Sequence, residues 1–180
     1  MKRLKFGLVG GAILLALTHI VVNAFALTFT NAGSISVPSS GSATPYPSII
    51  VVSGVAAVIN DVNVTLRGLT HAFPADLDIL LVGPGGQMTL LMSDIGGGTD
   101  ITGITLTFDD AASGSVPNPI NSGTFKPTNF LGGDVFPMPA PGGPYGTQLS
   151  VFDGTVANGV WRLFVFDDGL FAAGIPICKQ

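Results

Sequence analysis

The sequence predicts an all-β fold, an antiparallel β-sandwich of jelly-roll type, from three observations. Every acidic residue is aspartate, and the chain also holds 25 glycines and 13 prolines, residue types that favour turns over helices. Several short stretches alternate apolar and polar side chains, as half-buried strands do. No stretch keeps a helical period of 3.6 residues. We therefore expect short strands joined by many turns.

The first 26 residues predict a secretory signal peptide. A basic start, an apolar run over residues 6–22 and a small-x-small motif ending at Ala26 are typical of such signals. The alternative is a retained membrane anchor, but Thr18 and His19 interrupt the run. We expect cleavage after Ala26 and a mature protein that is secreted or extracytoplasmic and free of the membrane.

The mature chain has the length of one domain and is acidic. Four basic and eleven acidic residues remain after cleavage, a balance that disfavours a nucleic-acid partner. Residues 27–48, rich in Ser, Gly, Pro and Thr, predict a flexible leader, and residues 49–180 predict the sandwich. Cys178 is the only cysteine, so no intrachain disulfide can form. The thiol either pairs between chains or has no role.

Five segments predict the main strands. Residues 62–66 and 104–108 alternate apolar and polar side chains. Residues 79–82 and 88–92 are apolar runs separated by a glycine-rich turn, which is typical of a hairpin. Residues 160–166 are apolar on both faces, so they predict a central strand.

A long connection over residues 111–147 holds seven prolines. Its only candidate anchors to the core are Phe125, Phe130, Leu131 and Phe136. Connections of this length are usually functional, and otherwise drape over a sheet.

Catalysis by this chain is disfavoured. His71 is the only histidine left after cleavage, no Gly-x-Ser-x-Gly motif is present, and the serines cluster in the leader. A hydrolase would have to use His71 with Asp76 or Asp78 and an unidentified serine. A pair of aspartates acting as in glycosidases stays open, although Asp-rich turns supply such pairs by chance.

The aspartates favour calcium over zinc as a ligand. Zinc needs three or four His or Cys ligands, the mature chain has one of each, and no motif predicts a nucleotide. Asp76 and Asp78 flank Leu77, so on a strand they point to the same side and repel unless a cation lies between them. Asp167 and Asp168 repeat the pattern at a strand end. The alternative is that these aspartates cap turns.

Two other residues, His71 and Trp161, are expected to have structural roles. His71 is expected to close a loop by hydrogen bonding, with Asp76 as its partner. Trp161 is expected to pack in the core rather than to stack on a ligand.

Two separated motifs, in the right order, resemble the P domain, also called the Homo B domain. This β-sandwich follows the catalytic domain in kexin- and furin-like subtilisin-type serine proteases, the proprotein convertases, and also occurs in bacterial secreted proteins. The resemblance covers about residues 50–170 and implies a jelly roll of the galactose-binding-domain-like kind. The first motif is matched by Leu69, His71, Asp76, Leu77, Ile79 to Leu81, Pro84 and Gly85. The second is matched by Phe152, Gly154, Gly159, Trp161, Leu163, Val165 and Asp167.

The chain departs from the family in three places. Residues 83–86 read Gly-Pro-Gly-Gly where the family has Ser-Pro-x-Gly-Thr, and the proline-rich loop matches poorly. The family also closes with a tryptophan-containing strand after the final glycine, whereas here only Ile-Pro-Ile-Cys-Lys-Gln follows Gly174. We therefore expect the final strand to be missing or replaced.

The resemblance implies a non-catalytic accessory role: stabilising a subtilisin-like protease domain and, in some members, binding calcium. This chain has no room for that catalytic domain, so the protease would be encoded separately. The alternative function is a stand-alone extracellular adhesion or carbohydrate-binding module, whose partner would be a cell-surface protein or glycan.

Overall fold

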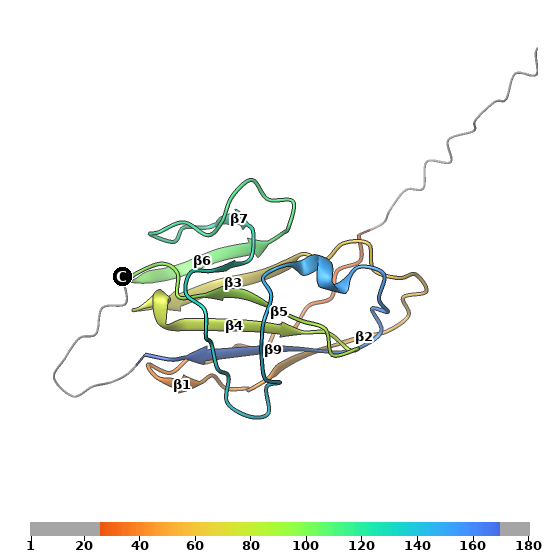
Figure 1. Ribbon diagram of the computed structural model, residues 1–180, viewed down its shortest axis with the longest axis horizontal. Coiled ribbons are helices and arrows are strands. Elements are labelled where there is room, and N and C mark those ends of the chain that lie inside the picture. Colours follow the sequence, from red (N-terminus) through yellow and green to blue (C-terminus); the bar gives the residue numbers. More distant parts are fainter. Residues whose placement is uncertain (1–25, 170–180) are drawn as a thin grey trace, which may run out of the picture.

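A computed structural model describes residues 26–169, and these residues form two stacked β-sheets (Figure 1). The strands of the first half are β1 (Gly41–Ser42), β2 (Ser48–Val52), β3 (Val64–His71), β4 (Leu77–Val82) and β5 (Met88–Ser93). Those of the second half are β6 (Ile101–Phe108), β7 (Gly123–Phe125), β8 (Thr128–Asn129) and β9 (Gly159–Asp167). Two 3-10 helices, η1 (Pro74–Asp76) and η2 (Leu149–Phe152), are the only helical turns in the described range. The all-β prediction is confirmed.

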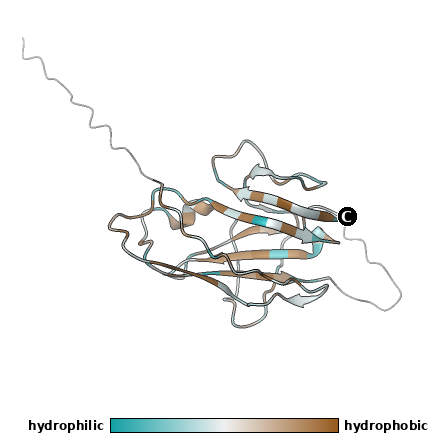
Figure 2. Ribbon diagram, turned by 180° about the vertical axis from the view of Figure 1, so that it is seen from behind, coloured by the Kyte–Doolittle hydropathy of each residue, from teal (hydrophilic) through white to brown (hydrophobic). Residues whose placement is uncertain are grey.

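The larger sheet has the order β1-β9-β4-β5-β8, with β2 also paired to β9, and the smaller sheet has the order β3-β6-β7. The long strands pair antiparallel, whereas β8 joins β5 and β7 joins β6 in parallel. The sheets are therefore mixed rather than purely antiparallel. The long connection adds one short parallel strand to an edge of each sheet, β8 to the larger and β7 to the smaller. Figure 2 shows polar and apolar bands along the long strands of the smaller sheet.

Both β4 and β9 lie where the sequence predicts them. β4 and β5 form the expected hairpin, whose turn is closed by the Gly83 amide donating to the Gln87 carbonyl at 2.8 Å. Gly86 supplies a positive φ of 88° in that turn. β9 pairs with β4 on one side and with β1 and β2 on the other, so it is central as predicted.

Gly159, at the start of β9, packs directly against the β4–β5 turn. Its φ is +133°, and a Cβ atom at this position would lie 2.5 Å from Cβ of Pro84. We expect Gly159→Ala to lower the free energy of unfolding by about 2 kcal/mol, since it adds strain and overlap together. Urea unfolding checks this. Gly142→Ala is the control, because that site has open space around it. An equal loss of unfolding free energy in the two variants would show that the β4–β5 turn moves aside for the added methyl group without cost.

The core lies between the sheets. Leu77 and Ile79 of β4 and Leu106 and Phe108 of β6 are each fully buried there. Trp161 packs against this core, with its ring centroid 4.9 Å from that of Phe152. The predicted packing role of Trp161 is confirmed.

The loop from Phe130 to Gln148, hereafter the covering loop, crosses the outer face of β5, β4 and β9 (Figure 1). It buries a second apolar cluster made of Leu80, Val82, Leu90, Phe136, Ala140 and Phe164. The long connection therefore does drape over a sheet. Of its predicted anchors, Phe136 is buried and Phe125 partly buried. Phe130 and Leu131 are exposed, so their prediction as anchors is wrong.

The predicted flexible leader is also partly wrong. β1 lies within it, Ser36 forms a β-bridge with Thr44, and Ala43 is only 2% exposed. Ile35 and Val37 pack against the core. Composition pointed to a leader, but these few apolar side chains suffice to bind the segment to the sandwich.

Three predictions lie outside the described residues: the signal peptide up to residue 25, the missing closing strand after Gly174, and the role of Cys178. Within residues 26–169, no helix is long and apolar enough to cross a membrane.

Candidate functional site

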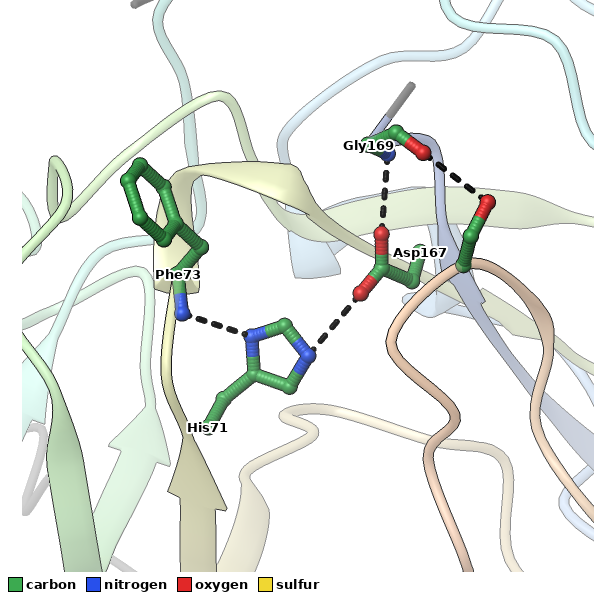
Figure 3. A network of polar contacts seen from close by, with 5 residues as sticks. His71, Phe73, Asp167 and Gly169 are labelled. Atoms are coloured by element: carbon green, nitrogen blue, oxygen red, sulfur yellow. Dashed lines mark hydrogen bonds and ion pairs between the residues drawn. The ribbon is translucent and has the colours of Figure 1, made fainter. Parts of the chain in front are cut away.

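The candidate residues gather at one end of the sandwich, where β3 and β9 end and β4 begins. His71 Nε2 lies 2.9 Å from Asp167 Oδ2 (Figure 3). β3 belongs to the smaller sheet and β9 to the larger, so this contact joins the two layers. The structural hydrogen-bonding role predicted for His71 is confirmed, but the predicted partner, Asp76, is wrong: the partner is Asp167.

Both ring nitrogens of His71 are engaged. The Phe73 amide donates to Nδ1 at 3.2 Å, so Nδ1 carries a lone pair and the proton sits on Nε2, which donates to Asp167 (Figure 3). A catalytic histidine needs one nitrogen free to accept a proton from a nucleophile. His71 offers no such nitrogen in this arrangement.

Asp167 is held on both carboxylate oxygens. While Oδ2 accepts from His71, Oδ1 accepts from the Gly169 amide at 2.8 Å. Burial raises the pKa of Asp167, and the hydrogen bonds from Gly169 and His71 oppose that rise. The Ser40 hydroxyl donates to the Gly169 carbonyl at 2.8 Å and so fixes the residue that caps Asp167.

Asp76 does not lie on a strand, which overturns the geometry predicted for Asp76 and Asp78. Asp76 ends η1 and β4 starts at Leu77. The Asp76 carboxylate instead approaches Gly169, where an added Cβ would be 2.5 Å from Asp76 Oδ2 and 2.8 Å from Asp167 Oδ1. The Asp76 carbonyl accepts from the Asp168 amide at 2.9 Å. Asp76 and Asp167 therefore share one neighbourhood, and Asp78 belongs to another.

Asp78 is only 2% exposed and lies beside the covering loop. The Ser93 hydroxyl is 2.6 Å from Asp78 Oδ1 and 2.5 Å from Asp134 Oδ1. A hydroxyl has one proton to donate. It can donate to only one of these carboxylates, so the other is open to a proton, a water or a cation.

Asn129 completes this arrangement. Its Nδ2 donates to Asp134 Oδ2 at 2.7 Å, and its Oδ1 is buried with no hydrogen-bond partner among the described residues. An unsatisfied buried oxygen costs free energy unless a water or an ion meets it. Carbonyl oxygens of this kind are common calcium ligands.

The surroundings of Asp78 are strongly acidic. We call Asp78, Asp94, Asp134 and Asp168 the acidic cluster. Burial, followed by the charges of Asp168, Asp134 and Asp94, raises the pKa of Asp78 to about 7, against the lowering effect of the Ser93 hydrogen bond. The cluster therefore attracts a proton or a cation near neutral pH.

The four sequence-predicted metal ligands are thus divided between two places. Asp76 and Asp167 meet at Gly169, while Asp78 interacts electrostatically with Asp168. No three His, Cys, Asp or Glu side chains between residues 26 and 169 are arranged to hold a metal ion by themselves. An ion here would need oxygens of other kinds.

Sequence reasoning missed Ser93, Asn129 and Asp134. Ser93 ends β5, Asn129 ends β8, and Asp134 lies in the covering loop. No spacing in the sequence relates them to Asp78, because only the pairing of β5 with β4 and β8 brings them together.

In comparisons with protein-family models, curated proteins and solved structures, no match to this chain is found. The P-domain resemblance therefore rests on the two sequence motifs alone.

Proposed function

We propose that this chain is a non-catalytic, secreted β-sandwich of the P-domain type that binds calcium at its acidic cluster and stabilises a separately encoded subtilisin-like protease domain. The observation that carries the calcium part is the single Ser93 hydroxyl between the carboxylates of Asp78 and Asp134. A divalent cation would neutralise the repulsion that one proton cannot.

The contacts between the two motifs support a P-domain module. His71 of the first motif contacts Asp167 of the second, and Pro84 of the first packs on Gly159 of the second. β4 and β9, which carry the motifs, also pair along their full common length. Residues that form the resemblance thus contact one another at both ends of the strand pair.

The chemistry of the donors supports calcium. Asp78, Asp134 and Asn129 Oδ1 offer oxygens from three different segments, and calcium binds six to eight oxygens, including carbonyls and water. Bound calcium would hold the covering loop to the larger sheet through Asp134. A non-catalytic role is supported by His71, whose two nitrogens are both occupied.

We expect calcium to raise the thermal midpoint of the chain. A ligand at about 100 times its Kd that binds only the folded state adds about 2.7 kcal/mol, which is several degrees for a domain of this size. The measurement is thermal unfolding in excess chelator and across a calcium titration at constant ionic strength.

Matched variants locate the ion. Asp78→Asn and Asp134→Asn should each abolish the calcium shift, while Asp153→Asn, an exposed aspartate at the other end of the sandwich, should keep it. Loss of the shift on Asp76→Asn alone would place the ion beside Gly169 instead. Absence of any shift in the wild type would remove calcium from the proposal.

The accessory role has its own test. The purified chain should hydrolyse no peptide substrate and should raise the thermal midpoint of a subtilisin-like protease domain from the same genome. Unchanged stability of every such domain would contradict the accessory role, whatever the result with calcium.

A further inference from the structure

The segment that leads into β3 holds the only N-glycosylation sequon of the sequence. Such a sequon reads Asn-x-Ser or Asn-x-Thr, where x is any residue except proline. Asn63, Val64 and Thr65 satisfy it, and no other asparagine of the chain is followed by this pattern. In a secreted protein, a sequon is used only where the asparagine lies at the surface, so the position of Asn63 decides whether the motif has a meaning.

Asn63 lies at the surface, and the chain around it is firmly anchored. Exposure alternates along the segment: Asn63 and Thr65 are exposed, whereas Val62, Val64 and Leu66 pack against the core. The apolar side chains therefore hold the asparagine side chain away from the core. A bulky group attached to it leaves the packing of the sandwich unchanged.

The present hydrogen bond of Asn63 is compatible with attachment. Its Nδ2 donates to Asp61 Oδ2 at 2.9 Å, and both side chains are exposed. An amide nitrogen has two hydrogens. Replacing one of them by a sugar leaves the other for Asp61, so the modified side chain keeps its contact.

The surface next to Asn63 is rich in hydroxyl groups. The register of the smaller sheet places Thr65 of β3, Thr107 of β6 and Thr124 of β7 in one row. The hydroxyls of Thr65 and Thr107 lie 3.0 Å apart at the surface. No large exposed hydrophobic residue of the described range lies on β3, β6 or β7. Since hydroxyls both donate and accept hydrogen bonds, this face suits the first sugars of an oligosaccharide.

We propose that Asn63 is an N-glycosylation site and carries an oligosaccharide linked through Nδ2. In the transfer, C1 of the first sugar forms a bond to Nδ2, the bond from C1 to the diphosphate of a lipid-linked donor breaks, and Nδ2 loses one proton. The Thr65 hydroxyl is bonded to that of Thr107 in the folded chain, so the transfer takes place before β3 and β6 pair. The site depends on secretion, which is part of the proposed function, and is independent of calcium and of any protease.

A glycan at Asn63 also has a physical use, because β3 is an edge strand. Within residues 26–169, β3 pairs with β6 alone, so its other edge is unpaired along eight residues (Figure 1). Unpaired edges of this length invite pairing with strands of other molecules unless something covers them. An oligosaccharide on the residue that precedes β3 occupies space that an incoming strand needs.

Mass spectrometry of the secreted protein tests the site. The full chain is expressed in its natural source with a C-terminal affinity tag and is isolated from outside the cytoplasm. The proteolytic peptide that contains residue 63 should carry the added mass of an oligosaccharide. A secreted chain in which this peptide has only the mass of its sequence would overturn the site and leave the proposed function standing. A chain that stays in the cytoplasm would overturn both.

Matched variants test the sequon. Asn63→Gln and Thr65→Val should each lose the added mass completely, since the first removes the acceptor asparagine and the second the hydroxyl of the sequon. Thr65→Ser should keep it. Asn60→Gln is the control, because Asn60 is a nearby exposed asparagine outside any sequon, and it should also keep the added mass. Added mass that survives Asn63→Gln, or that Asn60→Gln removes, would contradict attachment at Asn63.

Discussion

His71→Ala should lower the free energy of unfolding by about 3 kcal/mol, since it leaves the Asp167 carboxylate buried without its partner in the other sheet. The two side chains are 9% and 1% exposed, so solvent cannot replace the contact. For a domain of this length, we expect the thermal midpoint to fall by about 10 °C. Calorimetry in chelator isolates the effect from any bound cation.

Two further variants separate the contact from simple loss of volume. Asp167→Asn keeps an acceptor for His71 and should cost less than His71→Ala. His71→Leu/Asp167→Leu removes both polar groups together and should recover part of the loss, as replacements of whole buried pairs do. If His71→Ala shifts the thermal midpoint no more than a substitution at an exposed residue such as Asp153→Asn does, the contact between His71 and Asp167 does not hold the two sheets together.

The metal-free protein should lose stability as the pH rises from about 4 to about 8. Asp78 has an ordinary pKa of 3.8 in the unfolded chain and a pKa of about 7 when folded. The folded state therefore binds the proton more tightly, and the stabilisation is complete below pH 4 and lost as the pH passes through 7. The difference amounts to about 4 kcal/mol for this group.

Asp78→Asn should remove the part of that dependence that comes from Asp78, because its amide stays neutral throughout. A smaller part should remain, since burial also raises the pKa of Asp167. The measurement is chemical unfolding at about pH 5 and about pH 8 in chelator, comparing wild type with variant. Asp153→Asn should keep the wild-type slope. Calcium competes with the proton, so its stabilising effect should be larger at the higher pH. A wild-type slope that matches that of Asp78→Asn would show that Asp78 is ionised in the folded protein.

Sequence patterns predicted several of the strands correctly. Alternation in residues 104–108 and the two apolar runs around the Gly83–Gln87 turn predicted strands that the structure contains. Apolar residues on both faces of residues 160–166 predicted the central position of β9. These patterns succeed because a strand that buries one face or two must carry apolar side chains at the matching period.

Sequence patterns did not predict which residues from distant segments contact one another. The sequence placed Asp76 beside His71 because it is near in the chain, yet Asp167 occupies that place because β9 ends under β3. Asp134 reaches Ser93 only because the covering loop is drawn across the larger sheet by Phe136.

Sequence patterns alone predict the all-β class, the hairpin and the central strand, and they also show the chemistry available at the site: carboxylates with one histidine. Which of these carboxylates lie close together depends on how the strands and loops pack. Local side-chain periodicity records the face that is buried, whereas contacts between distant segments depend on strand order and loop packing, which leave no periodic trace in the chain.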